Sequence, residues 1–168
     1  MISKHRTQHG FTLIELMIIL VLLGIFLAIA VPSFSQFISS NKALATRNEL
    51  LSLLQFARAQ AATERTSIRV CSTDTGTNSK WQVQRKNCEG EMIRSLALAA
   101  GISANTKDGP TEISFHYNGT AEPSTIICIC YQEDFANGYT IEIEASGNIR
   151  SYDKGHNKNT PMTSCTPS

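Results

Sequence analysis

A run of sixteen apolar residues near the N-terminus is the feature that most constrains this chain. The run covers residues 16–31, includes Gly24, and is followed by no charged side chain until Lys42. A helix needs about 20 apolar residues to cross a bilayer, so the run and its uncharged flank are long enough to span a membrane. The polar remainder of the 168 residues fits one small globular domain on an apolar stalk.

The net charge of the chain is too small for binding to nucleic acid through overall positive charge. The net charge is +1, and the first ten residues carry Lys4 and Arg6 without any acid. The rest of the chain therefore holds 13 of the 15 basic residues and all 14 acidic ones. Bulk binders of nucleic acid are strongly basic, so any such binding here requires a local patch.

The N-terminus has two ordinary explanations, and neither accounts for Glu15. A secretory signal peptide has a shorter apolar core followed by a small-residue cleavage site, whereas this run leads into Pro32 and Phe34. A plain signal anchor fits better, because Lys4 and Arg6 would hold the N-terminal end in the cytoplasm. A carboxylate costs about 2.5–3.5 kcal/mol at the centre of a membrane helix, and less near an interface. Glu15 is therefore expected to have a partner.

Residues 10–15, with the sequence GFTLIE, resemble the processing site of type IV prepilins. The match is a short basic leader ending in glycine, then phenylalanine, then a glutamate five positions after the leader. In that family a membrane peptidase cuts after the glycine and methylates the new amine. The resemblance implies a leader at residues 1–10, cleavage between Gly10 and Phe11, N-methylated Phe11, and a transmembrane and assembly helix at residues 11–35.

Cleavage would give Glu15 an electrostatic role. The new α-amine of Phe11 has a reference pKa of about 7.7–8.0, so it is largely protonated at neutral pH. In a helical stack, Glu15 of one subunit can meet the Phe11 amine of its neighbour. Opposite charges attract strongly in a low dielectric, and the pairing offsets both desolvation costs. We therefore expect this pair to set the axial register of assembly.

Helical spacing of apolar residues continues beyond the apolar run. One stripe at positions i, i+3, i+4, i+7 and i+11 is formed by Leu50, Leu53, Leu54, Ala57 and Ala61. The stripe predicts an amphipathic helix at residues 36–65 with one face packed on a sheet. Pro32 should kink the helix or melt it locally.

Residues 50–63, together with residues 68–71, resemble the GspH/FimT group of minor pilins and pseudopilins. This resemblance implies a structural subunit of a type IV pilus or of a type II secretion pseudopilus, in the tip or priming complex. It also implies prepilin peptidase and other pilin subunits as partners. The protein would lie in the bacterial inner membrane as a single-pass protein with its head in the periplasm, before it enters a filament.

After residue 65 the pattern changes to the period of two that is typical of strands. The expected strands cover residues 66–72, 81–85, 92–98, 111–117, 125–131, 139–145 and 148–153, separated by turn sequences such as Asn118-Gly119, Asn137-Gly138 and Ser146-Gly147. The last two strands should form a hairpin, and the polar tail from Gly155 should be a loop. The predicted fold is α+β: a long N-terminal helix packed on an antiparallel sheet in a β-rich head of residues 66–168.

Five cysteines, all beyond the apolar run, predict disulfides in an exported domain. Cys71 and Cys88 flank a turn-rich segment and can be joined. Cys128 and Cys130 are two apart in an expected strand, so they point the same way and are poorly placed to bond each other. One of them should reach Cys165, and we favour Cys130.

DNA binding is the alternative function. Some FimT-like proteins bind DNA during natural transformation through a G-R-x-R motif near the C-terminus. The matching residues here are Gly147 and Arg150, but Asn148 replaces the first arginine. Arg150, Lys154 and Lys158 form a local basic stretch that could contact phosphates. The competing interpretation is an ordinary solvated hairpin edge.

Sequence motifs of common enzymes are absent. We find no G-x-S-x-G, P-loop or H-E-x-x-H pattern. The cysteines and His156 lack regular metal-ligand spacing. We therefore expect neither catalysis, nor a cofactor, nor a bound metal.

Overall fold

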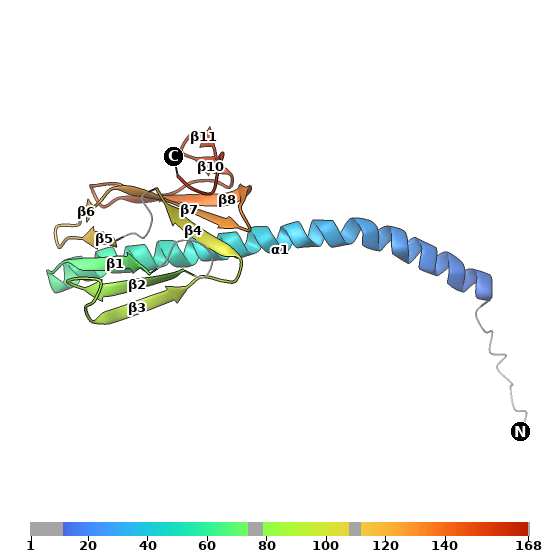
Figure 1. Cartoon of the computed structure of the whole chain (residues 1–168), viewed down its shortest axis with the longest axis horizontal. Coiled ribbons are helices and arrows are strands. Elements are labelled where there is room, and N and C mark those ends of the chain that lie inside the picture. Colours follow the sequence, from blue (N-terminus) through green and yellow to red (C-terminus); the bar gives the residue numbers. More distant parts are fainter. Residues whose placement is uncertain (1–11, 74–78, 108–111, 168) are drawn as a thin grey trace, which may run out of the picture. The chain divides into compact units, whose positions relative to one another are not determined.

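The computed structural model describes residues 12–73, 79–107 and 112–167. Within them, one helix precedes eleven strands (Figure 1). The elements in chain order are α1 (Leu13–Glu64), β1 (Ile68–Ser72), β2 (Lys80–Arg85), β3 (Met92–Ala97), β4 (Ile102–Thr106), β5 (Glu112–Phe115), β6 (Ala121–Glu122), β7 (Thr125–Tyr131), β8 (Asp134–Ile143), β9 (Ile149–Ser151), β10 (His156–Asn157) and β11 (Thr160–Pro161).

The chain forms two compact units, residues 1–37 and residues 38–168, and α1 belongs to both. In the first unit, every described side chain is exposed. A window of 18 residues in α1 has a mean hydropathy of 3.0, so this helix is long and apolar enough to cross a membrane.

The helix continues without interruption through Pro32. The expected local melting at this proline is therefore wrong, because a helix can continue past one missing hydrogen bond.

In the second unit, α1 ends in a defined cap rather than by fraying. Arg65 has a φ of 52°, and the Thr66 N–H donates to the Ala61 carbonyl at 3.3 Å. This six-to-one hydrogen bond around a left-handed residue is the Schellman arrangement, which usually uses glycine where this chain has Arg65. The cap turns the chain sharply from the helix into β1.

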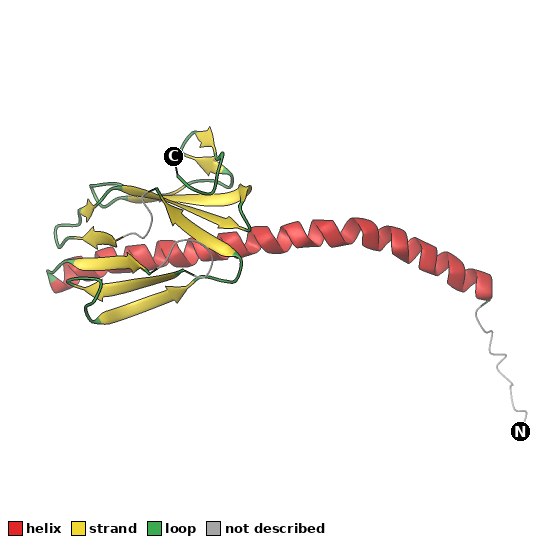
Figure 2. Ribbon diagram, viewed as in Figure 1, coloured by secondary structure: helices red, strands yellow, loops and turns green. Residues whose placement is uncertain are grey.

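All strand pairs are antiparallel and form three sheets. The first sheet has the order β3-β2-β1-β5-β6, the second β4-β7-β8-β9, and the third is the β10-β11 hairpin. The first two sheets flank the second half of α1 (Figure 2). The chain therefore has the predicted α+β fold with a long N-terminal helix packed on antiparallel sheet.

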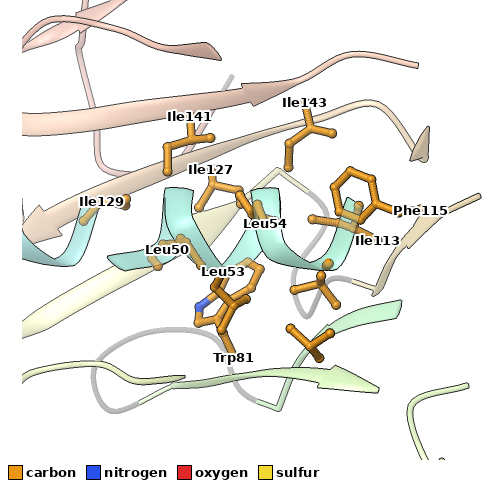
Figure 3. Packing of buried hydrophobic residues seen from close by; sticks show 14 of the residues in the cluster. Leu50, Leu53, Leu54, Trp81, Ile113, Phe115, Ile127, Ile129, Ile141 and Ile143 are labelled. Atoms are coloured by element: carbon orange, nitrogen blue, oxygen red, sulfur yellow. The ribbon is translucent and has the colours of Figure 1, made fainter. Parts of the chain in front are cut away.

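The main core lies where the helix stripe meets both sheets. The predicted stripe is confirmed, since Leu50, Leu53, Leu54, Ala57 and Ala61 are all buried. Around it pack side chains of the first sheet (Trp81, Ile113, Phe115) and of the second sheet (Ile127, Ile129, Ile141, Ile143) (Figure 3). Burying each large aliphatic or aromatic side chain contributes about 1.5–3 kcal/mol. The sheets are thus attached to the helix mainly by apolar contact.

One predicted turn is wrong. Asn137-Gly138 lies within β8, and the chain instead reverses at Gln132 and Glu133, which have φ angles of 49° and 61°. These two residues join Tyr131 of β7 to its partner Asp134 of β8. Two successive left-handed residues match a type I′ hairpin turn, which normally contains asparagine and glycine.

The strands follow the sequence pattern less closely outside the core. The expected strand at 111–117 is shorter in the structure: β5 ends at Phe115, His116 and Tyr117 lie outside it, and residue 111 lies outside the described residues. Two additional strands, β4 and β6, were not expected. The tail is not simply a loop, because it contains the β10-β11 hairpin. A backbone hydrogen bond closes the base of this hairpin, since the Met162 N–H donates to the Gly155 carbonyl at 2.8 Å.

Candidate functional site

The N-terminal site is described from Thr12 onwards, so Gly10 and Phe11 lie outside the described residues. Thr12 precedes the first helical residue, and its hydroxyl oxygen accepts a hydrogen bond from the Glu15 backbone N–H at 3.3 Å. The Leu16 N–H donates to the Thr12 carbonyl at 3.2 Å. Thr12 is therefore the N-cap of α1, and Glu15 occupies the third helical position of the capping-box pattern T-x-x-E.

This placement gives the Glu15 carboxylate two properties. It lies in the first turn of α1, where the partial positive charge of the helix terminus favours an anion. Its side chain is exposed, so a second chain can reach it. The T-x-x-E pattern of residues 12–15 is the sequence signal of this intramolecular contact.

The cysteines that sequence analysis pairs are bonded in the structure. Cys71 of β1 is joined to Cys88, with their Cα atoms 5.8 Å apart. Cys130 of β7 is joined to Cys165 in the tail, with their Cα atoms 5.9 Å apart. The first bond ties the segment after β2 to the sheet, and the second ties the tail to β7.

Cys128 keeps a free, buried thiol. It shares a small apolar cluster with Cys130, Met162 and Cys165, so Cys128 and Cys130 lie on one side of β7 as predicted. Burial raises the pKa of the Cys128 thiol to about 11. Since the thiolate is the nucleophile, this cysteine is chemically quiet at neutral pH.

Gly138 makes the tail contact possible. A Cβ atom at this position would lie 2.9 Å from the Ile129 carbonyl oxygen, 3.0 Å from Cys130 Sγ and 3.3 Å from Met162 Cε. Glycine therefore lets Met162 and the Cys130–Cys165 bond pack directly on β8. The Asn137-Gly138 pair that suggested a turn is thus explained by a close approach within a strand.

The basic stretch near the C-terminus is largely paired with carboxylates. Arg150 Nε lies 3.7 Å from Glu144, and Lys158 Nζ lies 2.5 Å from Glu142. Burial alone would raise the pKa of Glu142, but hydrogen bonds from Lys158 and Tyr152 outweigh it and lower this pKa. The hydrogen bond to Glu142 in turn raises the pKa of Lys158.

The proposed DNA-contacting residues therefore do not form a cluster of unpaired cations. Lys154 is exposed and has no ion pair within the described part of the chain, whereas Arg150 and Lys158 are both paired. Gly147 has a geometric role. Its φ is 76°, and a Cβ atom there would lie 1.8 Å from the Gly119 carbonyl oxygen. Gly147 thus allows the β8-β9 turn to touch the turn after β5.

Across 12–73, 79–107 and 112–167, no three His, Cys, Asp or Glu side chains gather as metal ligands. The residues that the structure does bring together are paired ions, disulfides and apolar packing, which suit a structural role.

Comparison with known proteins gives two family matches. The family described as "Type II transport protein GspH" matches residues 46–147, and the "Prokaryotic N-terminal methylation motif" matches residues 5–31. The type IV major alpha-pilin of Moraxella bovis is 44% identical over 45 residues, which are 27% of this chain. The match spans only 28% of that pilin's length.

Solved structures support the same fold. The type IV minor pilin FimU of Pseudomonas aeruginosa superposes with a TM-score of 0.62 at 23% identity, covering 74% of this chain and 96% of that chain. A second crystal form of FimU gives a TM-score of 0.59 at 22% identity, covering 73% of this chain and 98% of that one. At this level of identity the likeness shows the fold.

Proposed function

Because the chain belongs to the GspH family and is a type IV minor pilin or pseudopilin, we propose that it is a structural subunit of a type IV pilus or a type II secretion pseudopilus. Members of this family assemble with other pilin subunits and are processed at the N-methylation motif. The observation that carries the proposal is one continuous helix: it begins within the methylation motif, exposes its apolar first part, and builds the core of the head with its second part.

The processing step uses residues 10 and 11. Prepilin peptidase would cut the Gly10–Phe11 bond and methylate the amine of Phe11, in line with the N-methylation motif over residues 5–31. Lys4 and Arg6 would keep the leader in the cytoplasm. The chain would then wait in the inner membrane as a single-pass protein, with the head in the periplasm, where its disulfides can form.

Assembly would use Glu15. Its exposed carboxylate, in the first turn of α1, can meet the Phe11 amine of a neighbouring subunit. The helix terminus already favours the charge, so the neighbour supplies a second stabilising contact rather than the only one. We place the subunit in the tip or priming complex by analogy with minor pilins. Labelling of its head should therefore be found at filament ends, and labelling along the whole shaft would contradict this position.

Intact-mass analysis of the membrane-extracted chain tests processing. The expected product lacks residues 1–10 and carries one added methyl group. A Gly10→Val variant serves as the uncut reference, because the peptidase site is altered while the apolar helix is unchanged. A parent chain that still begins at Met1 would contradict the processing proposal.

Filament incorporation tests the role of Glu15. Breaking an ion pair that is buried between subunits costs about 3–5 kcal/mol, so Glu15→Ala and Glu15→Gln should be cleaved normally but enter filaments at least about tenfold less. Glu15→Asp keeps the charge and should retain more incorporation than either. Equal incorporation of Glu15→Ala and the parent would remove the electrostatic explanation.

A DNA receptor for natural transformation is the second candidate. The feature that favours it is the G-x-x-R sequence of Gly147 and Arg150, with Arg150 and Lys154 both exposed. Glu142 and Glu144 oppose it, because they pair with Lys158 and Arg150 and reduce the local positive charge. The structural-subunit function accounts for more of the chain and is preferred.

A further inference from the structure

A groove with both polar and apolar lining residues crosses the head between the end of α1 and two turns. It is lined by Gln55, Arg58 and Ala62 of α1, by Tyr117 and Asn118 after β5, and by Asn148 before β9. Its volume is about 520 Å³. All of these residues belong to the compact unit of residues 38–168. We call this site the Arg58 groove.

Arg58 is partly buried and has no bonded partner. Within the described residues, its guanidinium takes part in no hydrogen bond or ion pair, although it carries five N–H donors and is always charged. Other described arginines each have at least one partner, which is a hydroxyl, a carboxylate or an aromatic ring: they are Arg47, Arg69, Arg85, Arg94 and Arg150. Arg65 also lacks one, but it is exposed at the helix end and lies outside the groove.

Two glycines keep the guanidinium accessible. A Cβ atom at Gly119 would lie 3.6 Å from Arg58 Nη2, and one at Gly147 would lie 3.3 Å from Arg58 Nε. Both glycines have positive φ angles, of 86° and 76°. At positions 119 and 147 the two turns therefore pass beside Arg58 without a side chain that could cover it.

The rest of the groove suits an anion. Among the lining residues that the structure describes, none is Asp or Glu. The Asn118 side-chain oxygen already accepts two hydrogen bonds from Thr120, at 3.1 and 2.8 Å, which leaves its amide N–H₂ to donate. Gln55 and Asn148 add further amides. At the rim, Tyr117 is 64% exposed and offers an aromatic contact of the kind enriched in protein interfaces.

The number of unpaired cations in the groove indicates which kind of anion it can bind. Binding to a nucleic-acid backbone requires several cations that follow successive phosphates. Among the described residues that line the groove, Arg58 is the one unpaired cation, and Arg150, two residues after Asn148 in the sequence, is engaged by Glu144. One guanidinium among amides matches a single carboxylate, which it can bind through two parallel hydrogen bonds.

We propose that the Arg58 groove binds an aspartate or glutamate side chain presented by a protein partner. That this partner is a neighbouring filament subunit rests on the proposed function. The carboxylate would accept hydrogen bonds from the Arg58 guanidinium and the Asn118 amide, while Tyr117 packs against the partner's adjoining backbone. Hydrogen bonds to a charged group contribute about 1.5–3 kcal/mol, which corresponds to a preference of at least about tenfold for the acid over its amide.

The test uses the full ¹⁵N-labelled chain in detergent micelles and two capped pentapeptides, one with a single Glu between alanines and one with Gln instead. The Glu peptide should shift the NMR signals of Arg58 Nε–H and of the Gly119 and Gly147 amides, saturably and at least about tenfold more tightly than the Gln peptide. Arg58→Gln should lose the difference, and the matched charge removal Arg65→Gln should keep it.

Equal binding of the two peptides to the parent chain would overturn the proposal without any variant, so a folding defect of Arg58→Gln cannot obscure the result. A ten-residue oligothymidylate is the third probe. If it shifts these signals and the Glu peptide does not, the groove binds phosphate and the proposal is wrong. Peptide binding is measured without assembly, so its failure leaves the processing and incorporation results standing on their own.

Discussion

Arg85 of β2 holds both carboxylate oxygens of Glu64, the last residue of α1, at distances of 2.6 and 2.8 Å. Gln60 donates a further hydrogen bond to Glu64 at 2.6 Å. These contacts attach the end of the helix to the first sheet, next to the sharp cap at Arg65. Hydrogen bonding from Arg85, followed by that from Gln60, lowers the pKa of Glu64 to about 2.

The Glu64 carboxylate makes the stability of the head depend on pH in the acidic range. Its folded-state pKa is depressed from 4.5 to about 2, so the stabilisation is present above pH 4.5 and is lost as the pH falls towards 2. Glu64→Gln should lower Tm at pH 7 and flatten the loss of Tm between these two pH values. The exposed Glu89, changed to Gln, is the control and should leave the slope as in the parent.

The helix stripe should dominate the stability of the head. Leu54 is fully buried between the sheets, and its truncation to alanine leaves a cavity. Leu54→Ala should therefore lower the free energy of unfolding by about 2–5 kcal/mol, measured by denaturant unfolding in micelles. Leu27→Ala removes the same atoms from an exposed site in the first unit and should leave unfolding of the head unchanged.

The contact between two turns requires glycine at position 147. Alanine there would adopt an unfavourable positive φ and bring its Cβ into the Gly119 carbonyl. Gly147→Ala should destabilise the head by more than about 1 kcal/mol. Gly24→Ala, where no atom lies within 4 Å of the added Cβ, is the matched control. Unchanged thermal unfolding of Gly147→Ala would contradict the close approach.

The tail should be released when its disulfide is removed. Cys165→Ser eliminates a link across 35 residues, which contributes about 2–4 kcal/mol. Limited proteolysis should then cut faster after Lys154 and Lys158. Cys128→Ala alters a cysteine of the same cluster without breaking a bond and should stay resistant. In non-reducing peptide maps, Cys71 joined to any of the last three cysteines would disprove the pairing.

The DNA candidate predicts a salt-dependent signature at Arg150. If the chain binds a duplex, Arg150→Ala should weaken binding and reduce the slope of log affinity against log salt by about one. Lys80→Ala removes a cation from β2 and should leave the slope unchanged. If the parent shows no salt-dependent binding, the DNA candidate is removed.

The sequence predicts the elements whose residues carry a repeating apolar pattern. The stripe from Leu50 to Ala61 and the strand at 125–131 follow directly from spacing. β4 does not, because the residues between Ile102 and Thr106 are Ser103, Ala104 and Asn105, which carry little strand signal. The hairpin turn at Gln132 and Glu133 lacks the usual glycine, so its local sequence does not predict a turn.

The site was predictable to a similar extent. Glu15 and the paired cysteines follow from motif and spacing, since chemistry restricts which residues can serve. The carboxylates that neutralise Arg150 and Lys158 become neighbours only through the β8-β9 pairing and the folded tail. The same is true of the Arg58 groove, whose three walls come from segments about 60 and 90 residues apart in sequence.

The cluster of Cys128, Cys130, Met162 and Cys165 is separate from the main core around α1. The C-terminal segment is therefore an accessory layer on the outer side of β7 and β8. Small tags or fluorophores inserted between Lys158 and Thr160 should be carried by this layer without disturbing the helix. The exposed connection between β10 and β11 is thus a suitable labelling site for following single subunits in living cells.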